Sequence, residues 1–203
     1  ADVARQGSGL VDDVECEMLN IRILIACEFS GIVRDAFRLE GADAVSCDLL
    51  PSEKPGPHIQ DDIRNVPLSR WDMLIAFPPC RYLARSGARW WPGREREQKD
   101  ALDFVRMLLT APVQSIALEN PVGCISTRIR KPDQIIQPYM FGHGETKRTC
   151  LWLKNLPPLQ YTFLVKGTIP RVHYEAPGQE RWKNRSRTLP GIASAMAKQW
   201  RAM

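Results

Sequence analysis

The stretch Trp71-Asp72-Met73-Leu74-Ile75-Ala76-Phe77-Pro78-Pro79-Cys80 contains an apolar run of strand length that two prolines bring to an end. Residues 73–77 predict a buried strand. A proline has no N–H to donate to a neighbouring strand, so the strand stops before Cys80. In open α/β sheets, ligands bind just beyond the carboxyl ends of the strands. Cys80 is therefore either a nucleophile at such an edge or a buried structural cysteine.

Segments with strand and helix patterns alternate on both sides of this stretch. We expect strands at residues 21–27, 44–47, 58–63, 71–77, 115–118 and 149–153, and helices at residues 32–40, 97–110 and 191–203. The alternation predicts an α/β fold, a mostly parallel, Rossmann-like sheet with helices on both faces. One such domain would span residues 21–203, after a loose leader at residues 1–20. Residues 81–96 and 154–185 have no regular apolar period and predict irregular loops.

The composition is that of an ordinary globular protein. The 203 residues are 44% hydrophobic and 25% charged, which is enough for one substantial core. No apolar stretch reaches the roughly 18–20 residues of a membrane span, and residues 1–17 lack the pattern of a signal peptide. The six cysteines form no CxxC pair, so we expect reduced thiols, no metal site and a cytoplasmic protein.

Basic residues are unevenly distributed along this chain, whose net charge is +5. They form four clusters, at residues 81–96, at residues 128–131, at Lys147-Arg148 and at residues 181–187. Such clusters are compatible with a nucleic-acid partner, and equally with solvated surfaces.

Polar or reactive groups follow four of the expected strands. These groups are residues 28–31, Asp48, Cys80 and Glu119-Asn120. Because the carboxyl ends of parallel strands meet at one edge of a sheet, we expect the four groups to form one site. A carboxylate beside a thiol is suited to act as a general acid or as a hydrogen-bond partner for a polarised ring. The alternative for Glu119 is a solvated surface carboxylate.

The same edge has features of a nucleoside-binding site. The turn Phe29-Ser30-Gly31 permits a close backbone approach. Asp48 stands where an acidic residue binds ribose hydroxyls in Rossmann-type sites, and Asp62 is placed to accept a hydrogen bond from an adenine amino group. The alternatives are a plain β–α turn, a surface turn and a helix cap.

These motifs carry a resemblance to a known family. Pro78-Pro79-Cys80 and Glu119-Asn120-Pro121-Val122 resemble, in order and spacing, the two signature motifs of the cytosine-5 DNA methyltransferases. Glu28-Phe29-Ser30-Gly31 is similar to that family's first motif, which borders S-adenosylmethionine. Residues 187–193 resemble its last motif, which closes over the cofactor. The chain is most similar to short members of the phage or prophage type, which implies a bacterial or phage-infected cytoplasm.

The resemblance implies an S-adenosylmethionine-dependent methyltransferase fold and a catalytic mechanism. A cytosine is flipped out of the stack, Cys80 attacks its carbon 6, and Glu119 contacts ring nitrogen 3 and the exocyclic amine. Arg148 matches an arginine that holds the cytosine carbonyl and the thiolate, whereas Cys150 stands where the family has a second arginine. The cofactor would be bound by Glu28, Phe29, Ser30, Gly31, Asp48, Asp62, Ile63 and Pro78.

The resemblance also implies DNA as the partner. Contacts with nucleic acid are expected from Arg81, Arg85, Arg89, Trp90, Arg128, Arg130 and Lys147. Trp90 is placed either to stack on bases or to pack on the sheet. The family's target-recognition domain has only residues 154–185 as its counterpart here. We therefore expect relaxed specificity, or specificity supplied by a protein partner.

Two other functions fit the same residues. One is the same chemistry on a free pyrimidine nucleotide, single-stranded DNA or RNA. The other is a catalytically silent module that holds DNA or a protein through its basic loops.

Overall fold

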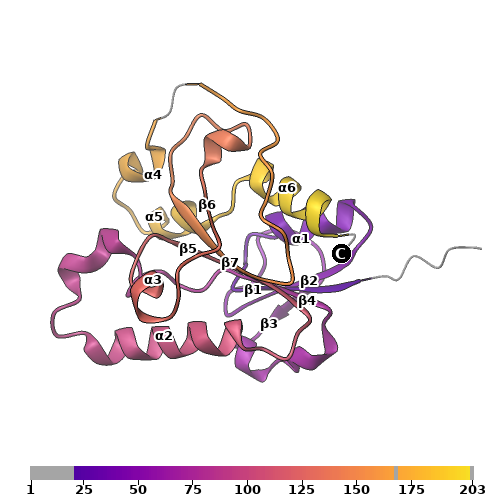
Figure 1. Cartoon of the computed structure of the whole chain (residues 1–203), viewed down its shortest axis with the longest axis horizontal. Helices are drawn as coiled ribbons and strands as arrows, with labels where there is room; N and C mark the ends of the chain where they lie inside the picture. The colour runs from indigo at the N-terminus through magenta and orange to yellow at the C-terminus, as the bar shows by residue number, and fades with distance from the viewer. Residues whose placement is uncertain (1–20, 167–168, 202–203) are drawn as a thin grey trace, which may run out of the picture.

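Within residues 21–166 and 169–201, which the computed structural model describes, seven strands form one sheet. The strands are β1 (Arg22–Ala26), β2 (Asp43–Asp48), β3 (His58–Gln60), β4 (Met73–Ala76), β5 (Ser115–Pro121), β6 (Gln134–Ile136) and β7 (Thr149–Lys154). Their order across the sheet is β3-β2-β1-β4-β5-β7-β6 (Figure 1). Strands β1 to β5 are parallel to one another. The predicted α/β class and the mostly parallel sheet are thus confirmed.

Helices cover both faces of this sheet. They are α1 (Ile32–Leu39), α2 (Glu95–Leu109), α3 (Ile125–Arg128), α4 (Arg171–Tyr174), α5 (Arg181–Ser186) and α6 (Pro190–Trp200), with short 3-10 helices η1 (Ile63–Asn65), η2 (Leu68–Arg70), η3 (Arg85–Trp90) and η4 (Pro138–Met140). Helices α1 and α6 lie side by side on one face, and α2 lies on the other (Figure 1). In the part of the chain that the structure describes, no helix is both long and apolar enough to cross a membrane.

The two layers of the core follow from the alternation of side chains along the strands. In β1, Ile23 and Ile25 pack in the layer of α1 and α6, where Trp200 is fully buried. Leu24 points the other way, into the layer that contains Val105 of α2. Because both faces are covered, these strands are continuous apolar runs instead of alternating ones.

Strand β7 departs from the predicted parallel arrangement, because it runs antiparallel to both β5 and β6. The sequence pattern does not predict β6, which is only three residues long. Between β6 and β7, residues 137–148 contain only η4. A parallel return requires a long crossover, usually a helix. This connection holds no such helix, so the chain returns in the opposite direction.

Strand β5 is longer than predicted. The strand expected at residues 115–118 continues to Pro121, because β7 pairs with these additional residues. Glu119 lies opposite Leu151, and Pro121 lies opposite Thr149. Glu119 is therefore a residue of the strand and not of the loop that follows it.

Two segments predicted as irregular contain helices. Residues 81–96 include η3 and the start of α2, and residues 154–185 include α4 and α5. The leader predicted at residues 1–20 lies outside the described residues, as do the last two residues of the terminal helix predicted at 191–203.

A fully buried arginine connects the first helix to the loop after β2. The guanidinium of Arg34 donates hydrogen bonds to the hydroxyls of Ser46 (3.2 Å) and Ser52 (3.1 Å) and to the carbonyl of Pro55 (2.9 Å). It also forms an ion pair with Asp35 at 2.8 Å. The donors of this buried cation are thus satisfied by groups from α1, from β2 and from the loop after β2, as burial of a charge requires.

Two glycines make room for this guanidinium. A Cβ atom would lie 2.6 Å from Nη2 of Arg34 if added at Gly31, and 2.8 Å from Cζ if added at Gly56. Both glycines have positive φ angles, +70° and +140°, which side chains disfavour. Arg34 therefore ties the turn after β1 to the loop at residues 51–57.

We expect the Arg34→Met variant to lose about 3 kcal/mol of unfolding free energy, because buried hydroxyl and carbonyl groups lose their donor. Arg38→Met is the matched control on the same helix. The Arg38 side chain is 42% exposed, so its loss is expected to cost about 1 kcal/mol or less. Urea denaturation measures both, and equal losses would contradict the structural role of Arg34.

Candidate active site

The order of strands reverses between β1 and β4, which are hydrogen-bonded neighbours. Ala26 and Ala76, the last residues of these strands, lie opposite one another. The N–H of Phe77 donates to the carbonyl of Ala26 (3.0 Å), which carries the pairing past both strand ends. Ligands of doubly wound sheets bind at such a switch point. The structure thus brings the turn at residues 27–31 and the loop that leads to Cys80 to this point.

The turn after β1 is organised around a buried carboxylate. Glu28 accepts hydrogen bonds from the Ser30 hydroxyl (2.7 Å) and from the N–H of Val33 (3.2 Å). Ser30 Oγ accepts in turn from the N–H of Ile32 (3.3 Å). Burial raises the pKa of Glu28, although these hydrogen bonds oppose the shift. The side chain of Glu28 thereby occupies the amino terminus of α1, where an anionic ligand would otherwise bind.

One oxygen of this carboxylate has no partner. Oε2 of Glu28 is buried and accepts no hydrogen bond from the described residues. The preceding residue, Cys27, has a positive φ of 58°. A non-glycine residue in this region is strained by about 1–3 kcal/mol, and such strain is common at ligand sites.

The two other acidic residues predicted at the cofactor site differ in their contacts. Asp48 ends β2 and accepts a hydrogen bond from the N–H of Leu50 (2.9 Å), and burial raises its pKa. Asp62 caps η1 and accepts from the N–H (3.0 Å) and Nε (2.9 Å) of Arg64. The helix-cap alternative therefore describes Asp62 as the structure shows it. The neighbouring Ile63 is buried in the core.

The loop that carries Cys80 is held from the side of β5. Asn120 donates a buried hydrogen bond of 2.8 Å to the carbonyl of Pro78. The N–H groups of Leu83 and Ala84 both donate to the carbonyl of Cys80, at 3.0 and 2.8 Å. Cys80 is an exposed residue. Its thiol is thus carried at the edge of the sheet by a backbone that is fixed on both sides.

Glu119 and Lys147 form the electrostatic surroundings of this thiol. Partial loss of water and the negative charge of Glu119 raise the pKa of Cys80, while the charges of Lys147 and Arg185 lower it. Burial raises the pKa of Glu119, and Lys147 and Thr149 oppose that shift. Glu119, Lys147 and Arg185 come from three separate segments, so the fold has gathered them around Cys80.

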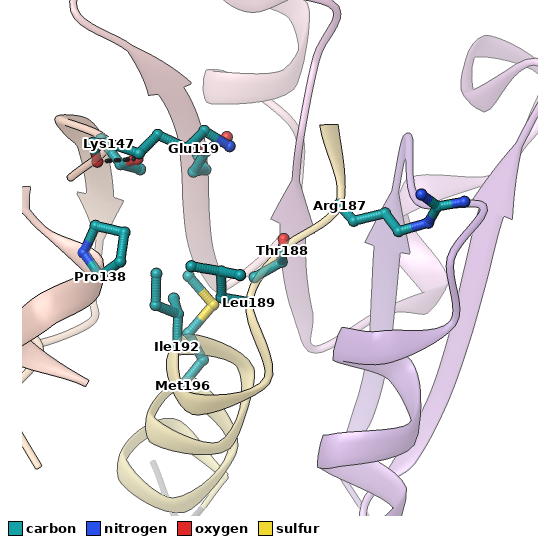
Figure 2. A pocket seen from close by; sticks show the side chains of 9 residues that line it. Glu119, Pro138, Lys147, Arg187, Thr188, Leu189, Ile192 and Met196 are labelled. Atoms are coloured by element: carbon teal, nitrogen blue, oxygen red, sulfur yellow. Dashed lines mark hydrogen bonds between the residues drawn. The ribbon is translucent and has the colours of Figure 1, made fainter. Parts of the chain in front are cut away.

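Glu119, Lys147 and Thr149 line one cleft, whose opposite wall includes Ile192 and Met196 of α6 (Figure 2). In this view the side chains of Lys147 and Glu119 point toward the same part of the cleft. Leu189, which precedes α6, completes the wall.

The structure exchanges the positions predicted for Arg148 and Lys147. Arg148, expected at the catalytic centre, is exposed. Its charge lowers the pKa of the buried Cys150 thiol, against the larger effect of burial. Lys147, expected on the DNA surface, lies in the cleft with Glu119. Of these two neighbouring residues, only Lys147 lines the cleft.

The predicted nucleic-acid residues are only partly brought together. Arg81, Arg85, Arg89 and Trp90 are exposed on the segment that follows Cys80. Within it, the guanidinium of Arg89 lies 4.8 Å from the centre of the Trp90 ring. Trp90 is 68% exposed, so it does not pack on the sheet.

Of the second cluster, Arg128 is exposed, while Arg130 has a structural role. Arg130 pairs with Asp133 at 2.8 Å and donates to the carbonyl of Leu153 at 3.0 Å. Its guanidinium is therefore already engaged within the fold.

Sequence reasoning missed the contribution of α5. The ring of Trp182 lies 5.9 Å from that of Phe29. Arg187, just after α5, donates to Glu53 at 2.8 Å and places its guanidinium 5.9 Å from the Phe29 ring. The sequence signals here were the basic run at residues 181–187 and the motif resemblance that begins at Arg187. Its contact with the turn after β1 could not be read from it.

No protein-family model matches this chain, and no curated protein matches it. Within residues 21–166 and 169–201, no group of three or more His, Cys, Asp or Glu side chains is arranged to hold a metal ion.

We expect the rate of Cys80 alkylation by iodoacetamide to keep rising above the pH at which an ordinary thiol is half ionised. The raised pKa of Cys80 makes its thiolate scarce at neutral pH and abundant only as the pH rises through the shifted value. Glu119→Gln removes a charge that raises this pKa, so the alkylation rate of Cys80 in this variant is expected to rise at lower pH than in the wild type. Mass spectrometry of the Cys80 peptide gives the rates.

The control variant is Asp100→Asn, which removes an exposed negative charge from α2. Its alkylation profile is expected to match that of the wild type. An unchanged profile in Glu119→Gln would show that Glu119 does not act on Cys80.

Proposed function

We propose that this chain is an S-adenosylmethionine-dependent methyltransferase that methylates carbon 5 of cytosine in DNA through a covalent Cys80 adduct. The observation that carries the proposal is the position of the Cys80 thiol. Cys80 is exposed at the switch point of a doubly wound sheet, and the carboxyl group of Glu119, on the neighbouring strand β5, raises the pKa of its thiol. The resemblance of residues 78–80 and 119–122 to the family's motifs supports the same reaction.

The turn after β1 supports a cofactor without phosphates. Dinucleotides place their pyrophosphate at the amino terminus of the first helix. Here the carboxylate of Glu28 occupies that position through its bond to Val33, and it would repel a phosphate. S-adenosylmethionine is a nucleoside without phosphate that carries a positive sulfonium and ammonium. The unpartnered Oε2 of Glu28 suits an ammonium group.

Phe29 and Asp48 complete the expected cofactor site. Phe29 is buried in the turn. The half-buried Asp48 carboxylate accepts backbone hydrogen bonds from the loop that follows β2, and its two oxygens keep lone pairs with which to bind ribose hydroxyls. When bound, S-adenosylmethionine supplies an electrophilic methyl group.

Cys80 and Glu119 account for the activation of the base. Carbon 5 of cytosine is a poor nucleophile, and addition of the Cys80 thiolate to carbon 6 moves a pair of ring electrons to carbon 5. The raised pKa of Glu119 makes its carboxyl group easier to protonate, so that it can donate a proton to ring nitrogen 3 as negative charge develops there. Once carbon 5 is methylated, loss of its proton re-forms the double bond and expels Cys80 as thiolate. The product is 5-methylcytosine.

The surface next to Cys80 supports a nucleic acid as the substrate. A base within a duplex must leave the stack to reach a thiol at the sheet edge. Exposed arginines and Trp90 follow Cys80 directly. Arginines neutralise phosphates and an exposed indole stacks on bases.

A second candidate substrate is a single strand or a free pyrimidine nucleotide. It is favoured by the segment at residues 154–185, whose described residues contain only the short helices α4 and α5. This segment holds no separate domain that would select a duplex sequence.

We expect calorimetry to show binding of S-adenosylmethionine and S-adenosylhomocysteine, and no binding of NAD or ATP. The physical reason is the carboxylate of Glu28 at the position of a phosphate. Asp48→Asn is expected to weaken S-adenosylmethionine binding about tenfold, or about 1.4 kcal/mol, whereas the exposed Asp100→Asn leaves it unchanged. Failure of both methionine-derived ligands to bind would overturn the proposed cofactor.

We expect an oligonucleotide with 5-fluorocytosine to trap Cys80 covalently when S-adenosylmethionine is present, because fluorine cannot leave carbon 5 as a proton does. The adduct survives denaturing electrophoresis. Cys80→Ser is expected to abolish it and to lower methylation roughly 10³-fold or more, whereas Cys124→Ala keeps both. Duplex, single-stranded DNA, RNA and nucleotide substrates are compared in parallel. If none of these substrates is methylated, the proposed activity is contradicted, and the catalytically silent binding module becomes the favoured function.

A further inference from the structure

We propose that Lys147, and not Arg148, is the positioning residue that holds Glu119 and the Cys80 thiolate in their reactive arrangement. The role of Lys147 in methyl transfer rests on the proposed function, whereas its action on Cys80 does not. This assignment goes against the alignment of motifs, in which Arg148 matches the catalytic arginine.

The pairing of β7 with β5 determines which side chains face Glu119. Residues directly opposite one another in an antiparallel pair lie on the same face of the sheet. Leu151 is opposite Glu119, and Thr149 is opposite Pro121. Thr149 is the first residue of β7, and Lys147, two residues before it, lines the same cleft as Glu119, whereas Arg148 does not.

The packing of β7 agrees with this register. Leu151 is buried in the layer of α6, and Cys150 is buried in the layer of α2. Lys147 and Thr149 line the cleft together with Glu119 (Figure 2). Arg148 does not line this cleft and is exposed.

The side chain of Lys147 is held across the cleft. Its Nζ donates a hydrogen bond of 3.2 Å to the carbonyl of Arg185 in α5. Its backbone N–H donates to the side-chain oxygen of Gln137 (3.0 Å), which fixes the start of the side chain. An ammonium group has three donors. The bond to Arg185 uses one, so donors remain for a carboxylate or a pyrimidine carbonyl.

The charge of Lys147 acts on both reacting groups. It lowers the pKa of the Cys80 thiol and opposes the effect of burial on Glu119. A thiolate beside a carboxylate is disfavoured because like charges repel. A cation that acts on both groups reduces that cost, so the site can hold more thiolate than the Cys80–Glu119 pair alone.

The test compares Lys147→Gln with Arg148→Gln, which removes the adjacent charge from the opposite face. The first readout is the pH profile of Cys80 alkylation without cofactor or substrate. Lys147→Gln is expected to move the profile to higher pH and to slow alkylation at pH 7.5 about threefold to tenfold, which corresponds to roughly half to one pKa unit. Arg148→Gln is expected to change the rate less than about twofold, and Lys147→Arg to stay near the wild type.

The second readout is kcat/KM for methyl transfer. It is expected to fall at least about tenfold in Lys147→Gln and to change less than about threefold in Arg148→Gln. A shift of the alkylation profile by Arg148→Gln and not by Lys147→Gln would overturn the proposal. If Lys147→Gln slows alkylation but the wild type methylates no nucleic acid, the action of Lys147 on Cys80 stands and the proposed function falls. Circular dichroism shows whether each variant is folded.

Discussion

The antiparallel pairing of β7 with β5 is the constraint on which the candidate active site depends. It extends β5 beyond the point where β4 ends, and so carries Glu119 within a strand to the edge where Cys80 is presented. It also determines which side chains of β7 face the cleft. Asn120, on the same extension, holds the Cys80 loop through the carbonyl of Pro78. One reversed strand therefore positions the carboxyl group, the thiol loop and the cation together.

Much of the fold could be predicted because its signals are local. The apolar run before Pro78 predicts β4, and the apolar face at residues 32–40 predicts α1, since each pattern needs only neighbouring residues. The direction of β7 could not be predicted, because it depends on how residues 137–148 connect it to a strand of three residues. The assignment of Arg148 followed from a motif, but in an extended chain a shift of one residue turns a side chain to the opposite face. The contact of Trp182 with Phe29 joins segments far apart in the sequence, and no local pattern encodes it.

The carboxylate of Glu28 shows how a common fold is adapted to one class of ligand. The amino terminus of α1 would attract any anion, and its first N–H groups are instead bonded to Glu28 and Ser30. The same bonds leave one buried oxygen of Glu28 without a partner. The helix is thereby stabilised by a group that also reverses the charge offered to a ligand.

The buried guanidinium of Arg34 links two glycines that are far apart in the sequence. Gly31 and Gly56 each lie against the guanidinium. Because neither has a side chain, each leaves space that the guanidinium fills. A larger residue at either glycine is tolerated only if the cation moves or is replaced. Among related sequences, these three positions should therefore vary together as a covarying set, and a smaller residue at position 34 should accompany any side chain at positions 31 or 56.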